Sequence, residues 1–165
     1  MTRTTEDAAM AMTTTQPAIA TVPITFPVGV PGFEEHHRFH LVGLGPAYGP
    51  WLALRSAIEG GPTFVVAQPY ELGVELTVEI DDLHQAVLGI ADPQQVLVLV
   101  VATLRNPHPT VNLRAPIVVN VEVLRAAQIP QDRDDYLLEA PVTVPLYDTA
   151  RLRPSEASDE PGADR

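Results

Sequence analysis

Apolar and polar side chains alternate strictly over residues 74–80, which is the pattern of a β-strand with one buried face. The inward row is Val74, Leu76, Val78 and Ile80, and the outward row is Glu75, Thr77 and Glu79. The longest apolar run, residues 96–104, is too short to cross a bilayer and predicts a strand buried on both sides or at its centre. The chain is therefore predicted to contain one strand with a polar outer face and one that lies deep in a sheet.

Shorter apolar segments separated by Gly and Pro predict further strands. They lie at 24–26, 38–44, 51–54, 63–67, 111–113, 117–124 and 127–129, with an interruption at Pro116. Between the alternating segment and the long apolar run, Asp81 and Asp82 can begin a short helix that ends at Gly89, because Asp is a favoured N-cap and Gly a favoured C-cap. We expect about two turns of helix there.

The 17 prolines argue against a helical bundle, because each one removes a backbone donor and clashes with the preceding turn of a helix. With short connections throughout, the pattern predicts an all-β fold, mainly an antiparallel barrel or sandwich, with one or two short helices. One domain is expected over residues 19–148. Residues 1–18 show no periodic pattern and residues 149–165 are rich in Pro, Ser and acidic side chains, so both are expected to be disordered tails.

The formal net charge is −11, and residues 20–147 alone contain six arginines and fourteen acidic residues. This acidity argues against nucleic acid as a direct partner and favours a basic protein. Cysteine is absent, which excludes disulfides and thiolate chemistry. The first residues do not read as a secretory signal and no apolar segment is long enough to cross a membrane, so a cytoplasmic location is expected.

His36, His37 and His40 lie close together in the sequence and invite a metal interpretation. Their spacing suits metal ligands only on a helix, whereas this segment reads as a turn leading into a strand. We therefore expect surface histidines and no metal site. His84 and His108 stand alone and support no catalytic dyad.

Residues 56–104 contain no arginine, although seven acidic residues fall there. A single-sign face of this kind steers a basic partner and raises its association rate. The alternative is that the carboxylates only solvate an edge strand and keep it from pairing with neighbours. On the first interpretation, the candidate partner-binding acids are Glu71, Glu75, Glu79, Asp81 and Asp82.

Three segments together resemble the FliW family. Residues 24–33 read ITFPVGVPGF, similar to the family's I-x-F-x-x-G-x-P-G-F signature; residues 64–70 read FVVAQPY; and residues 112–120 read NLRAPIVVN, matching N-L-x-A-P-[IV]-x-[IV]-N throughout. The positions that carry the match are Phe26, Gly29, Pro31, Gly32 and Phe33, then Pro69, then Ala115 and Pro116, with Gln128 beyond them. Ala127 departs from the glycine that many relatives have.

The resemblance implies a FliW-like β-domain that binds newly made flagellin in the cytoplasm as a chaperone. When flagellin is scarce, such a protein instead binds the translational regulator CsrA, which is expected to be basic, and relieves its repression of flagellin translation. The resemblance implies no catalysis and no cofactor. On this view an apolar groove would accept an amphipathic helix of flagellin, and the acidic face would meet CsrA.

Asn112 and Asn120 flank the Ala115-Pro116 step. Their amides are expected to satisfy backbone groups freed by the proline, and direct contact with a partner is the alternative. Two other classes of function also stay open: a small β-barrel that binds a ligand or acts as an enzyme on an unknown substrate, and a structural subunit of a larger assembly.

Overall fold

The computed structural model describes residues 21–105 and 108–145, and the predicted tails lie outside these residues. The strands are β1 (Thr21–Thr25), β2 (Arg38–Gly43), β3 (Leu52–Ser56), β4 (Thr63–Ala67), β5 (Val96–Thr103), β6 (Thr110–Asn120), β7 (Arg125–Gln128) and β8 (Ala140–Pro141). In the same described ranges, the helical elements are α2 (Asp82–Leu88) and the 3₁₀ turns η1 (Pro46–Tyr48), η2 (Pro69–Leu72) and η3 (Pro93–Gln95).

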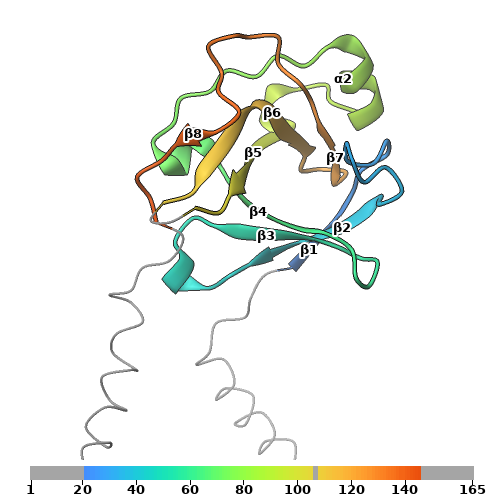
Figure 1. Ribbon diagram of the computed structural model, residues 1–165. Coiled ribbons are helices and arrows are strands. Elements are labelled where there is room, and N and C mark those ends of the chain that lie inside the picture. The colour runs from blue at the N-terminus through green and yellow to red at the C-terminus, as the bar shows by residue number, and fades with distance from the viewer. Residues whose placement is uncertain (1–20, 106–107, 146–165) are drawn as a thin grey trace, which may run out of the picture.

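The strands close into a barrel (Figure 1). The hydrogen-bonded order is β5-β4-β3-β2-β1-β7-β6, and β5 also pairs with β6, so seven strands complete the ring. Every pairing is antiparallel except the short parallel contact of β1 with β7, where Thr25 lies opposite Arg125. β8 adds to the first part of β6. The predicted all-β, mainly antiparallel fold is thus confirmed, and it is a barrel and not a sandwich.

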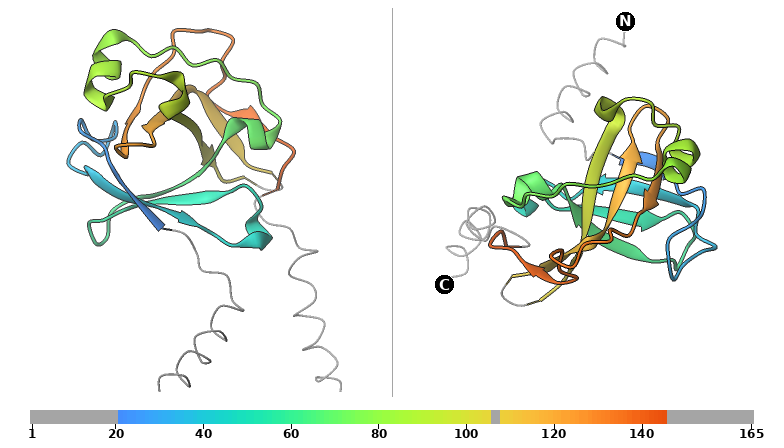
Figure 2. Two further views of the ribbon diagram at one scale, coloured as in Figure 1. Left: turned by 180° about the vertical axis from the view of Figure 1, so that it is seen from behind. Right: turned by 90° about the horizontal axis from the view of Figure 1, so that it is seen from above.

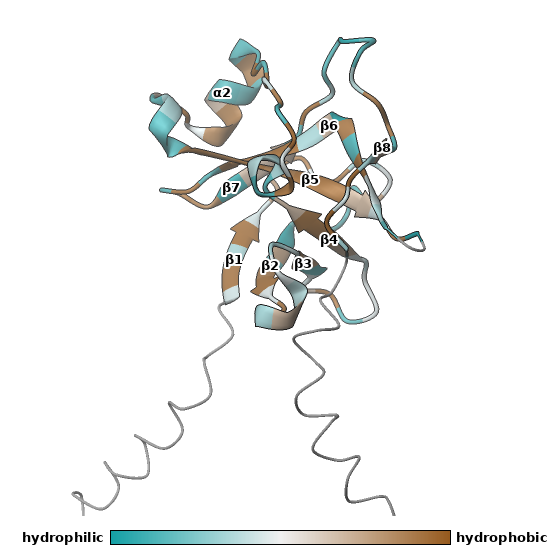
Figure 3. Cartoon of the chain, turned by 90° about the vertical axis from the view of Figure 1, so that its left-hand side faces the viewer, coloured by the Kyte–Doolittle hydropathy of each residue, from teal (hydrophilic) through white to brown (hydrophobic). Residues whose placement is uncertain are grey.

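Alternation along the strands divides the apolar side chains between two faces. The barrel interior holds aromatic and aliphatic side chains such as Phe26, Phe39, Leu54 and Leu99. The opposite face of β5 and β6 carries a second cluster around Trp51 and a third cluster that includes Leu88 of α2. β4 and β5 accordingly appear mainly hydrophobic along their length, whereas α2 is of mixed hydropathy (Figure 3). The outer face of β5 is therefore a second apolar surface that other segments must cover.

The strand predicted at 74–80 is absent, although its alternation is correct. Leu76, Val78 and Ile80 are half-buried while Glu75 and Glu79 are exposed, but the segment makes no ladder with any strand in the described part of the chain. It runs in extended form from η2 to α2 across the outside of the barrel, beside the segment that follows β7 (Figures 1 and 2). Period-two patterning reports which side chains are buried, and it does not reveal whether a backbone partner exists.

The interruption predicted at Pro116 is also wrong, because β6 is continuous from Thr110 to Asn120. Leu99 lies opposite Ile117 whereas Val101 lies opposite Asn112, so the strand bulges between them. A bulge leaves residues outside the ladder, and there a proline without an N–H is tolerated. The predicted strand at 117–124 is shorter than expected, since residues 121–124 form the turn into β7.

The short helix is confirmed with both of its caps. The carboxylate of Asp81 accepts the backbone N–H of His84 at 2.8 Å, and Gly89 ends α2 in the left-handed region at φ 67°. α2 packs beside β7 at one end of the barrel (Figure 1).

Candidate partner-binding groove

Side chains take the place of a strand partner along residues 74–80. The backbone N–H of Thr77 donates to Tyr136 Oη at 3.1 Å, and the same hydroxyl donates to the carbonyl of Thr77 at 2.8 Å. Two residues further on, the N–H of Glu79 donates to Gln131 Oε1 at 2.8 Å, and Gln131 Nε2 donates back to the carbonyl of Glu79 at 3.1 Å. Both side chains are buried. The segment is therefore pinned by paired hydrogen bonds at alternate residues, as a strand would be.

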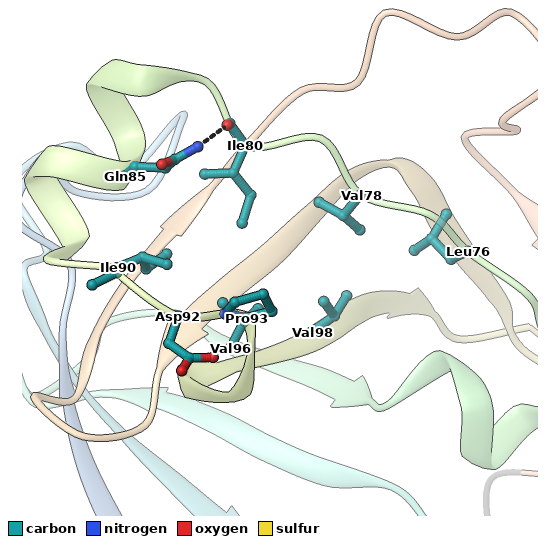
Figure 4. A pocket seen from close by; sticks show the side chains of 10 residues that line it. Leu76, Val78, Ile80, Gln85, Ile90, Asp92, Pro93, Val96 and Val98 are labelled. Carbon is teal, nitrogen blue, oxygen red and sulfur yellow. Dashed lines mark hydrogen bonds between the residues drawn. The ribbon is translucent and has the colours of Figure 1, made fainter.

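The inner row of this segment forms one wall of an apolar groove of about 440 Å³. Leu76, Val78 and Ile80 project toward the outer face of β5, where Val96 and Val98 form the facing wall (Figure 4). The remaining lining residues are Gln85 of α2 and Ile90, Ala91, Asp92 and Pro93 of the loop after it. The groove continues the third apolar cluster, since Val78, Ile80, Ile90 and Val96 pack against it. Its walls are thus a half-buried extension of the protein core.

The outer row of the same segment carries the acidic residues singled out in the sequence. Glu75 and Glu79 are exposed on the side opposite the groove, Asp81 and Asp82 follow directly, and Glu71 is exposed in η2. The backbone N–H of His84, with its side chain, holds the pKa of Asp81 below its ordinary value. Acidic and apolar surfaces therefore alternate along one short stretch of chain.

Asn112 and Gln128 lie apart from this surface and organise the bulge in β6. Asn112 Oδ1 accepts the backbone N–H groups of Arg114 at 2.9 Å and Ala115 at 3.1 Å, and Gln128 Nε2 donates to the carbonyl of Ala115 at 2.9 Å. The N–H of Ile129 reaches the carbonyl of Pro116 at 2.9 Å. These bonds satisfy backbone groups that the bulge removes from the ladder. Asn112 and Gln128 also line a cavity of about 210 Å³ beneath Pro31.

Asn120 is completely buried and holds the end of α2. Its Nδ2 donates to the carbonyls of Leu88 at 2.9 Å and Gly89 at 3.1 Å, while its Oδ1 accepts the N–H of Glu122 at 2.9 Å. Because its side chain has no exposed surface, Asn120 can influence a partner only by positioning α2 and the groove wall that α2 provides.

The first family segment makes a tight turn that caps the barrel. Gly29 has φ 75°, and a Cβ there would lie 2.4 Å from the backbone oxygen of Glu34, so only glycine fits. Phe33 packs edge-on against Phe64 at a centroid distance of 5.7 Å. The remaining family positions are structural as well: Phe26 is buried in the barrel, Pro31 and Gly32 form the turn, and Pro69 is the buried first residue of η2.

His36 and His37 make hydrogen bonds within the protein. His36 Nδ1 lies 2.8 Å from Ser56 Oγ and is buried, contrary to the predicted surface position, and His37 Nδ1 donates to the carbonyl of Phe26 at 2.9 Å. His40 is half-buried on β2. Among residues 21–105 and 108–145, no three His, Cys, Asp or Glu side chains form a group that could hold a metal ion. Neither His36 nor His40 lines the groove or the cavity beneath Pro31.

The fold and the site define a small β-barrel protein: seven strands close the barrel, and an apolar groove beside exposed carboxylates lies on its outside. The chain belongs to the FliW protein family, whose model matches residues 4–142. The flagellar assembly factor FliW of Caldanaerobacter subterraneus subsp. tengcongensis is 35% identical over 121 residues, covering 72% of this chain and 81% of that protein. The FliW of Oceanobacillus iheyensis is 32% identical over 124 residues, covering 74% and 84%.

The fold agrees with that of a solved relative. A crystal structure of the flagellar assembly factor FliW superposes with a TM-score of 0.65 at 28% sequence identity, covering 72% of this chain and 84% of the other. Within the described ranges, no helix has the length and apolar character required to traverse a bilayer. The predicted family and fold class are thus confirmed, and the chain is similar to proteins named for flagellar assembly.

Proposed function

We propose that this chain binds flagellin in the cytoplasm as an assembly chaperone and, when free of flagellin, binds CsrA and relieves its repression of flagellin translation. Membership of a family of flagellar assembly factors supports a role in flagellar assembly. The protein acts by binding other proteins and carries out no catalysis. Flagellin occupies the apolar groove with an amphipathic helix, and CsrA meets the acidic row formed by Glu75, Glu79, Asp81 and Asp82.

The observation that carries this proposal is the two-sided segment 74–80. Its inner side chains line the groove and its outer side chains are carboxylates, so surfaces suited to an apolar and to a basic partner are only one residue apart. Two ligands compete when their sites overlap or when they favour different states. Here the two surfaces share one segment, and a bound helix covering the groove would leave little room for a second protein beside it.

Binding of purified flagellin and purified CsrA, each measured by titration calorimetry, tests the proposal. Combined Glu75→Gln and Glu79→Gln substitutions should weaken CsrA binding by about tenfold or more and reduce its dependence on salt, because the exposed acids act mainly through long-range attraction. Flagellin binding should change little. Val78→Thr together with Val98→Thr, which keeps side-chain volume but adds hydroxyls to the groove, should weaken flagellin binding, because the added hydroxyls lose water when the groove is covered.

The matched control is the pair Glu35→Gln and Glu59→Gln. Both residues are exposed and lie outside segment 74–80, so the net charge changes equally while the acidic row stays intact. Equal loss of CsrA affinity in the two double variants would show that only the overall charge matters. Failure of the unaltered chain to bind flagellin at any salt concentration would overturn the proposed function.

A further inference from the structure

At Leu76 and Val78, one edge of segment 74–80 has no hydrogen-bond partner within the described chain. In an extended chain, the backbone groups of alternate residues point to opposite sides. Thr77 and Glu79 point toward Tyr136 and Gln131. Within the described chain, no hydrogen bond involves the backbone N–H or C=O of Leu76 or Val78. The segment is thus bonded along one edge and open along the other.

The open edge is bounded by α2. The carbonyl of Ile80 would continue the same edge, but Gln85 Nε2 donates to it at 2.8 Å (Figure 4). The unpaired stretch is therefore short, with two residues offering two donors and two acceptors. The side chains of these two residues, Leu76 and Val78, also line the apolar groove. A strand added at this edge would place alternate side chains next to them, facing the groove.

We propose that the basic partner binds here by strand addition, supplying an extended segment that pairs with Leu76 and Val78. This inference deepens the proposed function, on which it rests, by assigning how CsrA is held. Strand addition provides affinity through backbone hydrogen bonds and specificity through alternate side chains. A helix satisfies its own backbone groups and would leave those of Leu76 and Val78 unpaired.

Charge complementarity sets the sequence that the added segment must have. Side chains on the same face of paired strands are neighbours. The positions beside Leu76 and Val78 enter the groove and must be apolar, whereas the positions beside Glu75 and Glu79 remain exposed and should be Lys or Arg. The occupant is therefore an extended segment of four or so residues that alternates basic with apolar side chains. Its apolar side chains enter the groove assigned to flagellin, which accounts for the mutual exclusion of the two partners.

Amide hydrogen exchange, followed by NMR on the labelled full chain with and without saturating unlabelled CsrA, tests the inference. In the free chain, the amides of Thr77 and Glu79 should exchange slowly and those of Leu76 and Val78 quickly. Saturation with CsrA should slow exchange at Val78, or at both Leu76 and Val78, by at least about tenfold, because those amides gain hydrogen bonds. The alternating pattern is specific to strand pairing.

A pair of substitutions tests the same point through affinity. Val78→Pro and Val78→Ala both shorten the side chain in the groove, but only proline removes the N–H. That N–H has no partner in the described chain, so its loss breaks no internal hydrogen bond, and the melting temperatures of the two variants check that both fold. Val78→Pro should bind CsrA about tenfold more weakly than Val78→Ala. Equal affinities would overturn strand addition.

The outcomes separate this inference from the proposed function. A CsrA complex in which Leu76 and Val78 exchange as fast as in the free chain overturns strand addition and leaves the proposed function intact. Protection of these amides by flagellin and not by CsrA would show that flagellin pairs with this edge, and it also overturns the inference. Protection that grows with the concentration of the free chain identifies a second copy as the occupant and also overturns the inference. Absence of any CsrA complex overturns both proposals.

Discussion

The side-chain amide of Gln131 pairs with the backbone of Glu79 in both directions, accepting its N–H at 2.8 Å and donating to its carbonyl at 3.1 Å. One glutamine thereby supplies the two hydrogen bonds that a neighbouring strand would otherwise make. Tyr136 repeats the arrangement at Thr77 with a single hydroxyl. Segment 74–80 is therefore held in a strand-like form by side chains, while the backbone groups of Leu76 and Val78 on its opposite edge have no partner within the described chain.

Gln131→Ala should release the segment at Glu79. Gln131 is only 6% exposed, and its loss leaves the partly buried backbone groups of Glu79 without partners. The free energy of unfolding should therefore fall by about 1–3 kcal/mol. Urea unfolding measures this change, and the amide of Glu79 should exchange faster. Tyr136→Phe removes only the hydroxyl and should lower stability by about 1 kcal/mol. Strictly additive effects in the double variant would contradict a shared role in pinning one segment.

The two glycines of the first family segment should respond differently to alanine. Both have positive φ, but a Cβ at Gly29 would lie 2.4 Å from the backbone oxygen of Glu34, whereas a Cβ at Gly32 would meet nothing within 4 Å. Gly32→Ala should therefore lower stability by about 1 kcal/mol, from backbone strain alone. Gly29→Ala should lower it by about 2–4 kcal/mol, because the surrounding backbone must also move. Thermal unfolding of both variants makes the comparison, and equal losses would refute it.

Asn120→Asp should lower the free energy of unfolding more than Asn120→Ala, because Asn120 holds the end of α2. Alanine removes the donor that serves the carbonyls of Leu88 and Gly89, at about 1–3 kcal/mol. Aspartate keeps the size but places buried carboxylate oxygens against the same carbonyls, so its effect should exceed that of alanine. Denaturant unfolding gives the order, and a smaller loss for aspartate would contradict the capping role.

The stability of α2 should fall in acid through Asp81. The bond from the backbone N–H of His84 lowers the pKa of this carboxyl from its ordinary value of 3.8, so the deprotonated form favours the folded helix. The contribution is present above about pH 3.8 and is lost as pH falls through the lower pKa of the folded state. Exchange of the His84 amide, followed as pH is lowered, should show this loss. Asp81→Asn, whose side chain caps without titrating, should remove that pH dependence.

Local signals predicted the helix with its caps and the burial pattern of segment 74–80 well, because each depends on neighbouring residues. The Asp81 cap, the Gly89 stop and the alternation at 74–80 are all set by side chains within a few positions. The hydrogen-bond partners of segment 74–80 could not be predicted in the same way. Gln131 and Tyr136 lie more than fifty positions away in the sequence, and their spacing resembles no motif, so only folding brings them to the segment.

The sequence located the acidic residues of the candidate surface but not its groove, and the role of either in binding stays a prediction. Glu75, Glu79, Asp81 and Asp82 are all exposed, and they share one short stretch of chain. The groove behind them depends on Val96 and Val98, which join it only because β5 packs beneath the segment. Asn112 and Asn120 are not part of this surface, because the bulge in β6 and the end of α2 occupy their amides.

If segment 74–80 serves both proposed partners, the chain can hold only one of them at a time. Sedimentation of the purified chain with flagellin and CsrA, each above its dissociation constant, tests it most directly. Two separate binary complexes are expected, with added flagellin displacing CsrA. A stable complex containing all three proteins would contradict it.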